Sequence, residues 1–268
     1  MTSANFNVFE RSWKALLTVF RRGGRPARQA YSNYPILPRR LPLLLFLLCL
    51  STFVVCGFAL FDDDVARYAQ GHKAHKTSAF LFFRATTDIG TAGWVLVTTA
   101  ILGLAISVMN LKLLPRARRW FWASLHADLN FTFFTVGVTG ILASLIKNTI
   151  GRARPKHLDT LGHLEFDFAR FEASFASFPS GHSTTFGALC MVLFLLLPRR
   201  LWPLWLVFAV LGGVSRIIVG AHYPSDVAAG LAFGGILTLL TARWLAKRGV
   251  LFIAGSSIFP ARKLRIHR

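Results

Sequence analysis

Six apolar runs separated by polar connections set the pattern of the chain. They are Leu41–Phe61, Thr91–Leu111, Leu129–Ile146, His182–Leu197, Leu201–Gly220 and Val227–Trp244. A helix of about 20 apolar residues is long enough to span the hydrocarbon core of a bilayer. The pattern therefore predicts an all-α fold: a polytopic membrane protein with six transmembrane helices.

The composition agrees with this interpretation and excludes other classes of protein. Hydrophobic residues make up 54% of the 268 residues, and charged residues only 16%, against about 25% in an ordinary soluble domain. A soluble fold of this length cannot bury so much apolar surface. The 25 Phe and 7 Trp residues exclude a disordered chain. Three cysteines predict no disulfide framework, since Cys49 and Cys56 would stand about 10 Å apart on one helix.

The distribution of charge predicts which ends of the helices face the cytoplasm. Of the 31 Lys and Arg residues, 21 lie in residues 1–40, 112–119, 199–200 and 243–268, on one side of the predicted membrane. Nine of the 11 acidic residues lie on the other side. Cytoplasmic loops collect Lys and Arg, so we expect both termini in the cytoplasm and the acidic side on the outer face of the membrane. Membrane topology explains the net charge of +20 better than nucleic-acid binding does.

Three segments follow from this layout. Residues 1–40 form a basic cytoplasmic segment, residues 41–245 a six-helix membrane domain, and residues 246–268 a basic cytoplasmic tail. Within residues 5–22, apolar side chains recur at helical spacing: Phe6, Phe9, Trp13, Leu16, Leu17 and Phe20. This spacing predicts an amphipathic helix lying on anionic lipid, or alternatively one packed on protein.

Ionisable residues gather at the predicted outer ends of the third and fourth runs, where such residues are functional candidates. Lys147 and Arg154 are two fixed cations that suit an oxyanion, because Arg offers a planar fork and Lys a point charge. Ser180 is a favourable N-cap, Gly181 lets a ligand approach the backbone, and His182 falls in the first helical turn. Free amides at a helix N-terminus bind phosphate.

The outer ends of the fifth and sixth runs carry further candidates. Arg216 must either extend toward water or pair with an anion. His222 and Asp226 are four residues apart, which would place them on one helical face, and Pro224 suits the start of that helix. A carboxylate bonded to one imidazole nitrogen leaves the other nitrogen as a nucleophile or base. Each feature taken alone also has a purely structural explanation.

In this order, the patterns K-x6-R-P, P-S-G-H and S-R-x5-H-x3-D resemble the three-part signature of the type 2 phosphatidic acid phosphatase superfamily. The resemblance covers Lys147–Asp226, with no departure at any signature position. It implies an all-helical membrane phosphatase with a metal-free mechanism and a phosphohistidine intermediate. By the same resemblance, His222 attacks phosphorus, Asp226 orients His222, and His182 protonates the leaving oxygen. The phosphoryl oxygens are then held by Lys147, Arg154, Ser180, Gly181 and Arg216.

Residues outside the signature predict less. Arg152 is interpreted as a solvated charge rather than a phosphate ligand. His157, His163, Glu165 and Asp167 have no spacing typical of a metal site, and we expect none. The aromatic residues of the outer loop at residues 156–178 either contact lipid, roof the site or pack within the loop.

Several functions fit this chemistry. The leading hypothesis is a lipid phosphatase that hydrolyses a lipid phosphate monoester or diphosphate at the periplasmic face, with no cofactor and no obligate protein partner. The alternatives are a phosphotransferase on the same scaffold, a non-enzymatic transporter, and a vanadate-binding haloperoxidase, whose relatives are soluble. Four substrates stay open: phosphatidic acid, phosphatidylglycerol phosphate, undecaprenyl diphosphate and lipid A phosphates.

Overall fold

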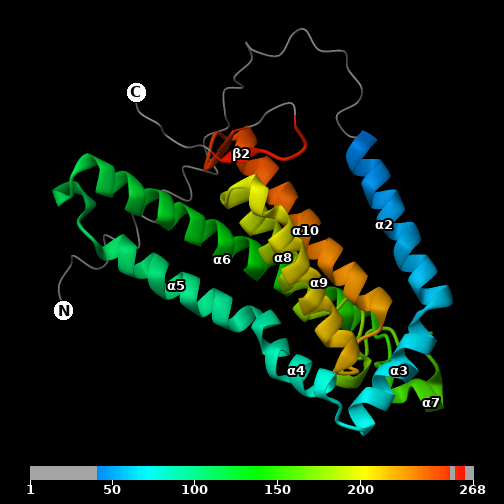
Figure 1. Cartoon of the computed structure of the whole chain (residues 1–268). Helices are drawn as coiled ribbons and strands as arrows, with labels where there is room; N and C mark the ends of the chain where they lie inside the picture. The colour runs from blue at the N-terminus through cyan, green and yellow to red at the C-terminus, as the bar shows by residue number, and fades with distance from the viewer. Residues whose placement is uncertain (1–40, 254–256, 263–268) are drawn as a thin grey trace.

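The computed structural model describes residues 41–253 and 257–262, which are mostly helical (Figure 1). The α-helices are α2 (Leu41–Leu60), α3 (Asp62–Ala74), α4 (Ser78–Thr86), α5 (Ala92–Val108), α6 (Arg116–Ile150), α7 (Leu158–Leu161), α8 (Gly181–Leu196), α9 (Trp202–Ile218) and α10 (Pro224–Lys247). Single 3-10 turns are η1 (Thr87–Gly90), η2 (Leu111–Leu113), η3 (Pro155–His157), η4 (Ala173–Phe175) and η5 (Arg199–Leu201). The expected amphipathic helix within residues 5–22 lies outside the described residues.

Each of the six apolar runs coincides with a helix: α2, α5, part of α6, α8, α9 and α10. Among the described residues, three helical segments are long and apolar enough to cross a membrane: Arg116–Ile150, Arg199–Ile218 and Pro224–Lys247. A fourth is formed if Ser78–Gly90 and Ala92–Val108, which meet at a bend of 41°, are one broken span. The helical membrane fold is thus confirmed in outline, whereas six spans and cytoplasmic termini stay predictions.

Helix α8 lies at the centre of the bundle and packs against α6, α9 and α10 (Figure 1). Two glycines allow the close approach of α8 and α10. A Cβ atom at Gly187 would stand 2.0 Å from the Leu231 carbonyl oxygen, and one at Gly234 would stand 2.0 Å from that of Thr184. Small residues let helix backbones meet in this way in membrane proteins. This contact fixes the first halves of α8 and α10 against each other.

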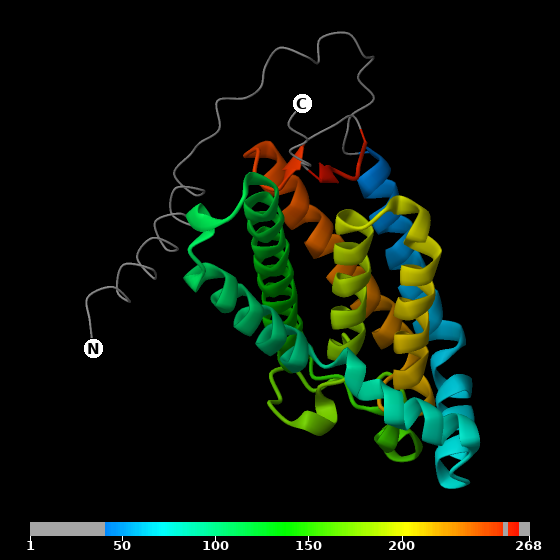
Figure 2. The same cartoon turned by 60° about the vertical axis from the view of Figure 1, so that its left-hand side comes forward.

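The connections at one end of the bundle are folded, although the sequence predicts them only as polar loops. The first two apolar runs are joined by α3 and α4, and α7 belongs to the long connection between α6 and α8. Figure 2 shows these segments at the end of the molecule where α8 and α10 begin. This end carries the signature residues.

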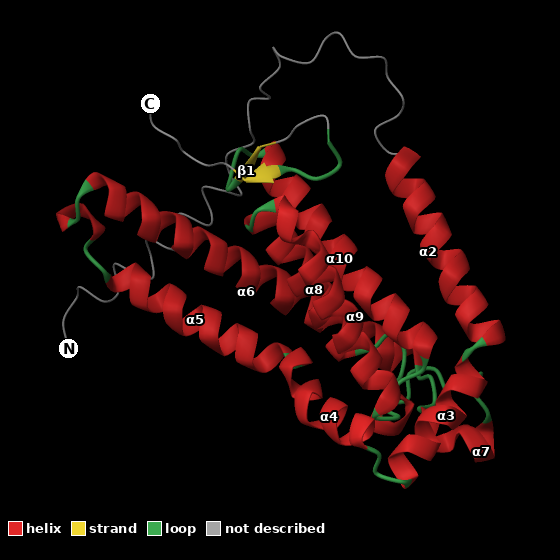
Figure 3. Ribbon diagram, in the orientation of Figure 1, coloured by secondary structure: helices red, strands yellow, loops and turns green. Residues whose placement is uncertain are grey.

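The opposite end is closed by two short antiparallel strands, β1 (Phe252–Ile253) and β2 (Ala261–Arg262), in which Phe252 pairs with Arg262 (Figure 3). Phe252 is fully buried and contacts Phe131 of α6 edge to face, with ring centroids 5.0 Å apart. Arg262 forms an ion pair with Asp128 of α6. The two strands that follow α10 are therefore packed onto the membrane domain.

Candidate active site

The three signature segments meet because each sits at a helix end on the same side of the bundle. Lys147 is in the last turn of α6, Ser180 caps α8, Arg216 is in the last turn of α9, and Asp226 is in the first turn of α10. His182 interacts electrostatically with four other predicted site residues: Lys147, Arg154, Arg216 and His222. The structure thus brings together the predicted histidines and cations.

The turn after α6 directs the first segment into the site. Gly151 ends α6 with a φ of 65°, a conformation that favours glycine. A Cβ atom there would lie 1.7 Å from the Asp167 carbonyl oxygen, so no larger residue fits. The next residues run beside the outer loop, where the Ala153 amide donates to Glu165 and the Arg154 amide to Ser174. Arg154 is fixed at the site by these backbone bonds.

The cations of the site lack carboxylate partners. Within the described part of the chain, Lys147, Arg154 and Arg216 form no ion pair, and the buried Nε atoms of Arg154 and Arg216 have no hydrogen-bond partner. Burial lowers the pKa of Arg154 below its usual range. A buried guanidinium nitrogen without an acceptor is costly, so the two Nε atoms favour a bound anion that supplies the missing acceptors.

Thr87 of η1 orients one of these cations. Its hydroxyl oxygen lies 2.6 Å from Nη1 of Arg216 and 3.1 Å from the hydroxyl oxygen of Ser215. Arg216 is 8% exposed, so its guanidinium is held inside rather than extended into water. Sequence reasoning missed Thr87, because no local pattern links η1 to the end of α9, 129 residues later.

The start of α8 has the expected geometry. Ser180 is the N-cap, and its hydroxyl oxygen accepts a hydrogen bond from the Ser183 amide at 3.4 Å. The Ser180 amide donates to the Asp226 carbonyl oxygen at 3.0 Å, which ties α8 to α10. A Cβ atom at Gly181 would meet nothing within 4 Å. This open space lets a ligand approach the helix terminus.

His222 is held in one orientation, 4% exposed. It lies in the loop before α10, so it does not share a helical face with Asp226 as the spacing predicted. Its Nδ1 atom is 2.9 Å from the Ser177 carbonyl oxygen and 3.7 Å from Oδ2 of Asp226. A carbonyl oxygen only accepts, so Nδ1 carries the hydrogen and Nε2 carries the lone pair. Ser177 is a further site residue that sequence reasoning missed.

Burial lowers the pKa of His222 below its usual value, an effect that Asp226 opposes. The neutral imidazole is therefore the resting form, which a nucleophile requires. Asp226 is itself buried and accepts hydrogen bonds at Oδ2 from the Ser177 hydroxyl, at 2.6 Å, and the Tyr223 amide, at 2.9 Å. The carboxylate and the imidazole are both tied to Ser177.

The interpretation of Arg152 as a solvated charge is wrong. Its side chain is fully buried and forms ion pairs with Asp62, at 2.9 Å, and Asp226, at 2.5 Å. Asp62, at the start of α3, is fully buried as well. Arg152 is therefore part of the scaffold behind the site.

Among the described residues, no group of three or more His, Cys, Asp or Glu side chains is placed so that it could hold a metal ion. The loop aromatics divide into two groups. Phe175 is buried and stacks on His157 with ring centroids 5.5 Å apart, whereas Phe168 and Phe171 are 73% and 80% exposed. Loop packing therefore accounts for some of these rings and not for others.

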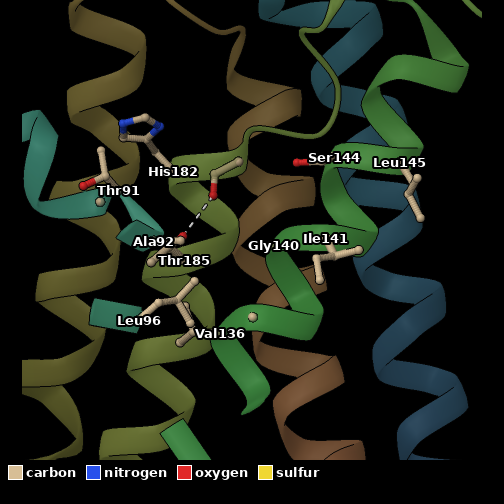
Figure 4. Close-up of a pocket in the computed structure, with 13 residues that line it drawn as sticks. Thr91, Ala92, Leu96, Val136, Gly140, Ile141, Ser144, Leu145, His182 and Thr185 are labelled. Atoms are coloured by element: carbon tan, nitrogen blue, oxygen red, sulfur yellow. Dashed lines mark hydrogen bonds between the residues drawn. The ribbon is translucent and has the colours of Figure 1, made fainter. Parts of the chain in front are cut away.

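A pocket of about 460 Å³ leads away from His182 between η1, α5, α6 and α8 (Figure 4). Its wall includes Leu96, Val136, Gly140, Ile141 and Leu145. Figure 4 shows the His182 ring beside Thr91 at one end, with Leu96 and Val136 toward the other. The pocket thus joins a polar site to an apolar surface that is partly exposed, since Ile141 and Leu145 are 64% and 60% exposed.

Comparisons with known proteins identify the family of the chain. A family model described as the PAP2 superfamily matches residues 128–249. The lipid A 1-phosphatase of Rhizobium johnstonii is 43% identical over 180 residues, which cover 66% of this chain and 72% of the relative. The undecaprenyl-diphosphatase BcrC of Bacillus subtilis is 36% identical over 110 residues, covering 40% of this chain and 55% of the relative.

A solved structure shows the same fold. The transmembrane PAP2 type phosphatidylglycerolphosphate phosphatase from Bacillus subtilis aligns with a TM-score of 0.53 and 24% identity, over 78% of this chain and 96% of that one. The family model and the relative that is 43% identical over most of its own length lead to one conclusion. The chain belongs to the PAP2 superfamily and is a membrane lipid phosphatase.

Proposed function

We propose that this chain hydrolyses a lipid phosphate through a covalent phosphohistidine at His222. One observation carries the mechanism: Nδ1 of His222 is committed to the Ser177 carbonyl oxygen at 2.9 Å, so Nε2 holds the lone pair. The electrostatic neighbours of His222 include Arg154 and Arg216, two arginines that form no ion pair with any residue in the described ranges. A fixed nucleophile beside unpaired cations is what phosphoryl transfer requires.

In the first step, Nε2 of His222 attacks phosphorus and the bond from phosphorus to the lipid oxygen breaks. The lipid oxygen takes a proton from His182, because an alkoxide is a poor leaving group. The imidazolium that forms still donates its Nδ1 hydrogen to the Ser177 carbonyl oxygen. The Asp226 carboxylate lies 3.7 Å from Nδ1. The products of this step are the lipid alcohol and phosphohistidine.

In the second step, water attacks the phosphohistidine and gives its proton to His182. The bond from phosphorus to Nε2 breaks, which releases inorganic phosphate and restores neutral His222. Lys147, Arg154 and Arg216 stabilise the charge on the equatorial oxygens in both steps, together with free amides at the start of α8. These groups provide positive charge that phosphatases of other classes obtain from metal ions.

The apolar pocket supports a lipid as the substrate. It begins at His182 and is lined mainly by apolar residues of α5, α6 and α8. An acyl chain that lies in it would bring its phosphorylated headgroup to the helix ends where the cations gather. Burial of that chain would contribute roughly 25 cal/mol for each Å² of apolar surface removed from water.

Among the open substrates, we propose lipid A carrying a phosphate at its 1-position. The support is that two relatives named lipid A 1-phosphatase, from Rhizobium johnstonii and Rhizobium etli, are 43% and 42% identical over two thirds of this chain. Relatives named for undecaprenyl diphosphate match shorter stretches.

The test is phosphate release by detergent-purified protein from four lipids: lipid A, phosphatidic acid, phosphatidylglycerol phosphate and undecaprenyl diphosphate. We expect the highest kcat/KM with lipid A, and mass spectrometry should show that its 1-phosphate is lost. His222→Ala is the inactive control. A higher kcat/KM with undecaprenyl diphosphate would show that this lipid, and not lipid A, is the preferred substrate. No phosphate release from any of the four lipids would contradict the proposed phosphatase function.

We also propose that the site faces the periplasm of the inner membrane, since the basic connections lie at the other end of the helices. Reporter fusions at Arg199 and Asp159 would test this orientation. The Asp159 fusion should show periplasmic activity and the Arg199 fusion should not. Periplasmic activity of the reporter fused at Arg199 would show that the proposed orientation is wrong.

A further inference from the structure

Behind the site lies a cluster of three buried charges drawn from separate parts of the chain. Asp62 belongs to α3, Arg152 follows α6, and Asp226 belongs to α10, and none of the three side chains is exposed. Asp62 lies outside residues 128–249, the region that matches the family. A buried ion cluster is costly to desolvate, so its presence does not by itself mean that it stabilises the fold. A role in the function of the site is the alternative.

The Arg152 guanidinium has a partner on every side. Nη1 donates to Oδ1 of Asp226 at 2.5 Å and to the Ser225 hydroxyl at 2.8 Å. Nη2 donates to Oδ2 of Asp62 at 2.9 Å and to the His163 carbonyl oxygen at 2.8 Å, and Nε reaches the same carbonyl at 3.2 Å. This geometry is rigid, because a planar fork is held between two carboxylates.

Asp62 is fixed just as firmly. Its Oδ1 accepts from the Ser225 amide at 3.0 Å, and its Oδ2 accepts from the Ser225 hydroxyl as well as from Arg152. Two carboxylates and one guanidinium give the cluster a formal charge of −1. Without Asp62, the charges of Arg152 and Asp226 would cancel.

We propose that Asp62 and Arg152 are positioning residues that tune His222: Asp62 offsets the Arg152 charge, so that the cluster keeps one net negative charge beside the imidazole. Arg152 holds Asp226 in place, and Asp62 stops Arg152 from neutralising it. The cluster acts on His222 through Asp226 and Ser177, since Oδ2 of Asp226 is 3.7 Å from Nδ1 and bonds to the Ser177 hydroxyl.

The charges around His222 explain why this negative charge is needed. On the side of the phosphate site, Arg154, Arg216 and the His182 ring all oppose a positive imidazole. The cluster behind it supplies Asp226, the carboxylate that favours the charged imidazole through both a hydrogen bond and its negative charge. The covalent intermediate places a positive charge on this imidazole, so its stability depends on the cluster. This consequence for the rate rests on the proposed function.

The first test measures the titration of His222 itself, which requires no turnover. Histidine-selective ¹⁵N NMR of the whole protein in micelles follows the imidazole, and the spectrum of His222→Asn assigns its signal. Asp62→Asn keeps the shape of the side chain and removes its charge. We expect the His222 midpoint to fall by about one pH unit, the scale of one charge lost at roughly 10 Å in a protein interior.

The matched control is Asp63→Asn. Asp63 is the neighbouring residue on α3, but its side chain is 40% exposed and pairs with Arg67 at 3.1 Å. This variant should leave the His222 midpoint where it is in the unmodified protein. An equal shift in both variants would overturn the proposal, because it would reflect a general disturbance of α3.

The double variant Asp62→Asn with Arg152→Gln separates charge balance from structural damage. It removes one negative and one positive charge, so Asp226 alone restores a net charge of −1, and Gln still donates a hydrogen bond. The midpoint should return to within about 0.3 units of the original value. A purely structural role predicts that the second substitution adds to the damage. A further fall in the double variant, or no fall in Asp62→Asn, would overturn the proposal.

Kinetics provide an independent second readout. With p-nitrophenyl phosphate, Asp62→Asn should lower kcat about tenfold. KM should stay nearly unchanged, because the phosphate-binding cations are untouched. The double variant should recover part of the loss in kcat. An increase in KM with kcat unchanged would overturn the proposal. If the unmodified protein releases no phosphate from any substrate, the proposed function fails, and the NMR midpoints still decide the assignment of charge.

Discussion

Arg152 and Arg154 lie two residues apart in one loop and have opposite surroundings. Arg152 is fully buried between the carboxylates of Asp62 and Asp226. Arg154 has no ion pair among the described residues, and its buried Nε has no hydrogen-bond partner. The first arginine completes a network inside the protein, while the charge of the second is left without a carboxylate partner among the described residues. Partners, rather than charge or burial, separate the scaffold of this site from its binding surface.

The same division runs through the whole site. Behind His222 the charges are paired: Asp62, Arg152 and Asp226 satisfy one another. In front of His222 the cations form no ion pair with any described residue, and the neutral Thr87 hydroxyl bonds to Arg216. A paired cluster can hold a nucleophile without attracting substrate, and an unpaired cluster can attract phosphate without being neutralised by the protein.

The largest effect should come from breaking the paired cluster. Arg152→Leu leaves Asp62 and Asp226 buried without a counterion, so the free energy of unfolding should fall by about 3–5 kcal/mol. Equilibrium unfolding in mixed micelles measures this loss. Stability within about 1 kcal/mol of the unmodified protein would show that Arg152 belongs with the binding cations.

Arg154→Gln should have the opposite profile. It removes an unpaired cation, so stability should stay within about 1 kcal/mol, while kcat with lipid substrate should fall by about 100-fold or more, the scale of one lost charge-stabilising donor. Parallel unfolding and phosphate-release measurements decide the matter. Unchanged turnover would remove Arg154 from the site.

A smaller effect is expected from Arg216→Lys. Lys keeps the charge but loses the planar fork, and with it the paired bonds to Thr87 and to a phosphoryl oxygen. We expect kcat to fall by about 10-fold. Near-normal turnover would mean that only the charge of Arg216 matters.

The smallest effect should follow chelation. The unpaired cations Lys147, Arg154 and Arg216 provide the positive charge of the proposed transition state, so phosphate release should be unchanged after EDTA treatment and dialysis. Activity lost to EDTA and restored by one divalent ion would show that these side chains do not suffice.

The sequence predicts features of this protein that depend on local pattern. Each apolar run became a helix, Ser180 caps α8, and Pro224 begins α10. The signature segments also meet as expected, because each stands at a helix end on the same side.

Features that depend on contacts between distant segments escaped prediction. Arg152 and Asp62 are 90 residues apart, and Arg262 and Asp128 are 134 apart. The periodicity of the sequence does not predict an ion pair between residues so far apart in the chain. Ser177 escaped for another reason: it holds His222 through a backbone carbonyl, which any residue carries. A charged residue in a polar loop therefore gives no sign of whether it is solvated or forms part of a buried cluster.

The most direct test compares His182→Ala and His222→Ala in a single-turnover burst with p-nitrophenyl phosphate, on protein shown to be folded. Nitrophenolate leaves without a proton, so His182→Ala should still release a measurable burst while losing most of its activity on lipid. His222→Ala lacks the nucleophile and should release none. Equal losses in both variants on both substrates, or a larger burst in His222→Ala, would contradict the account.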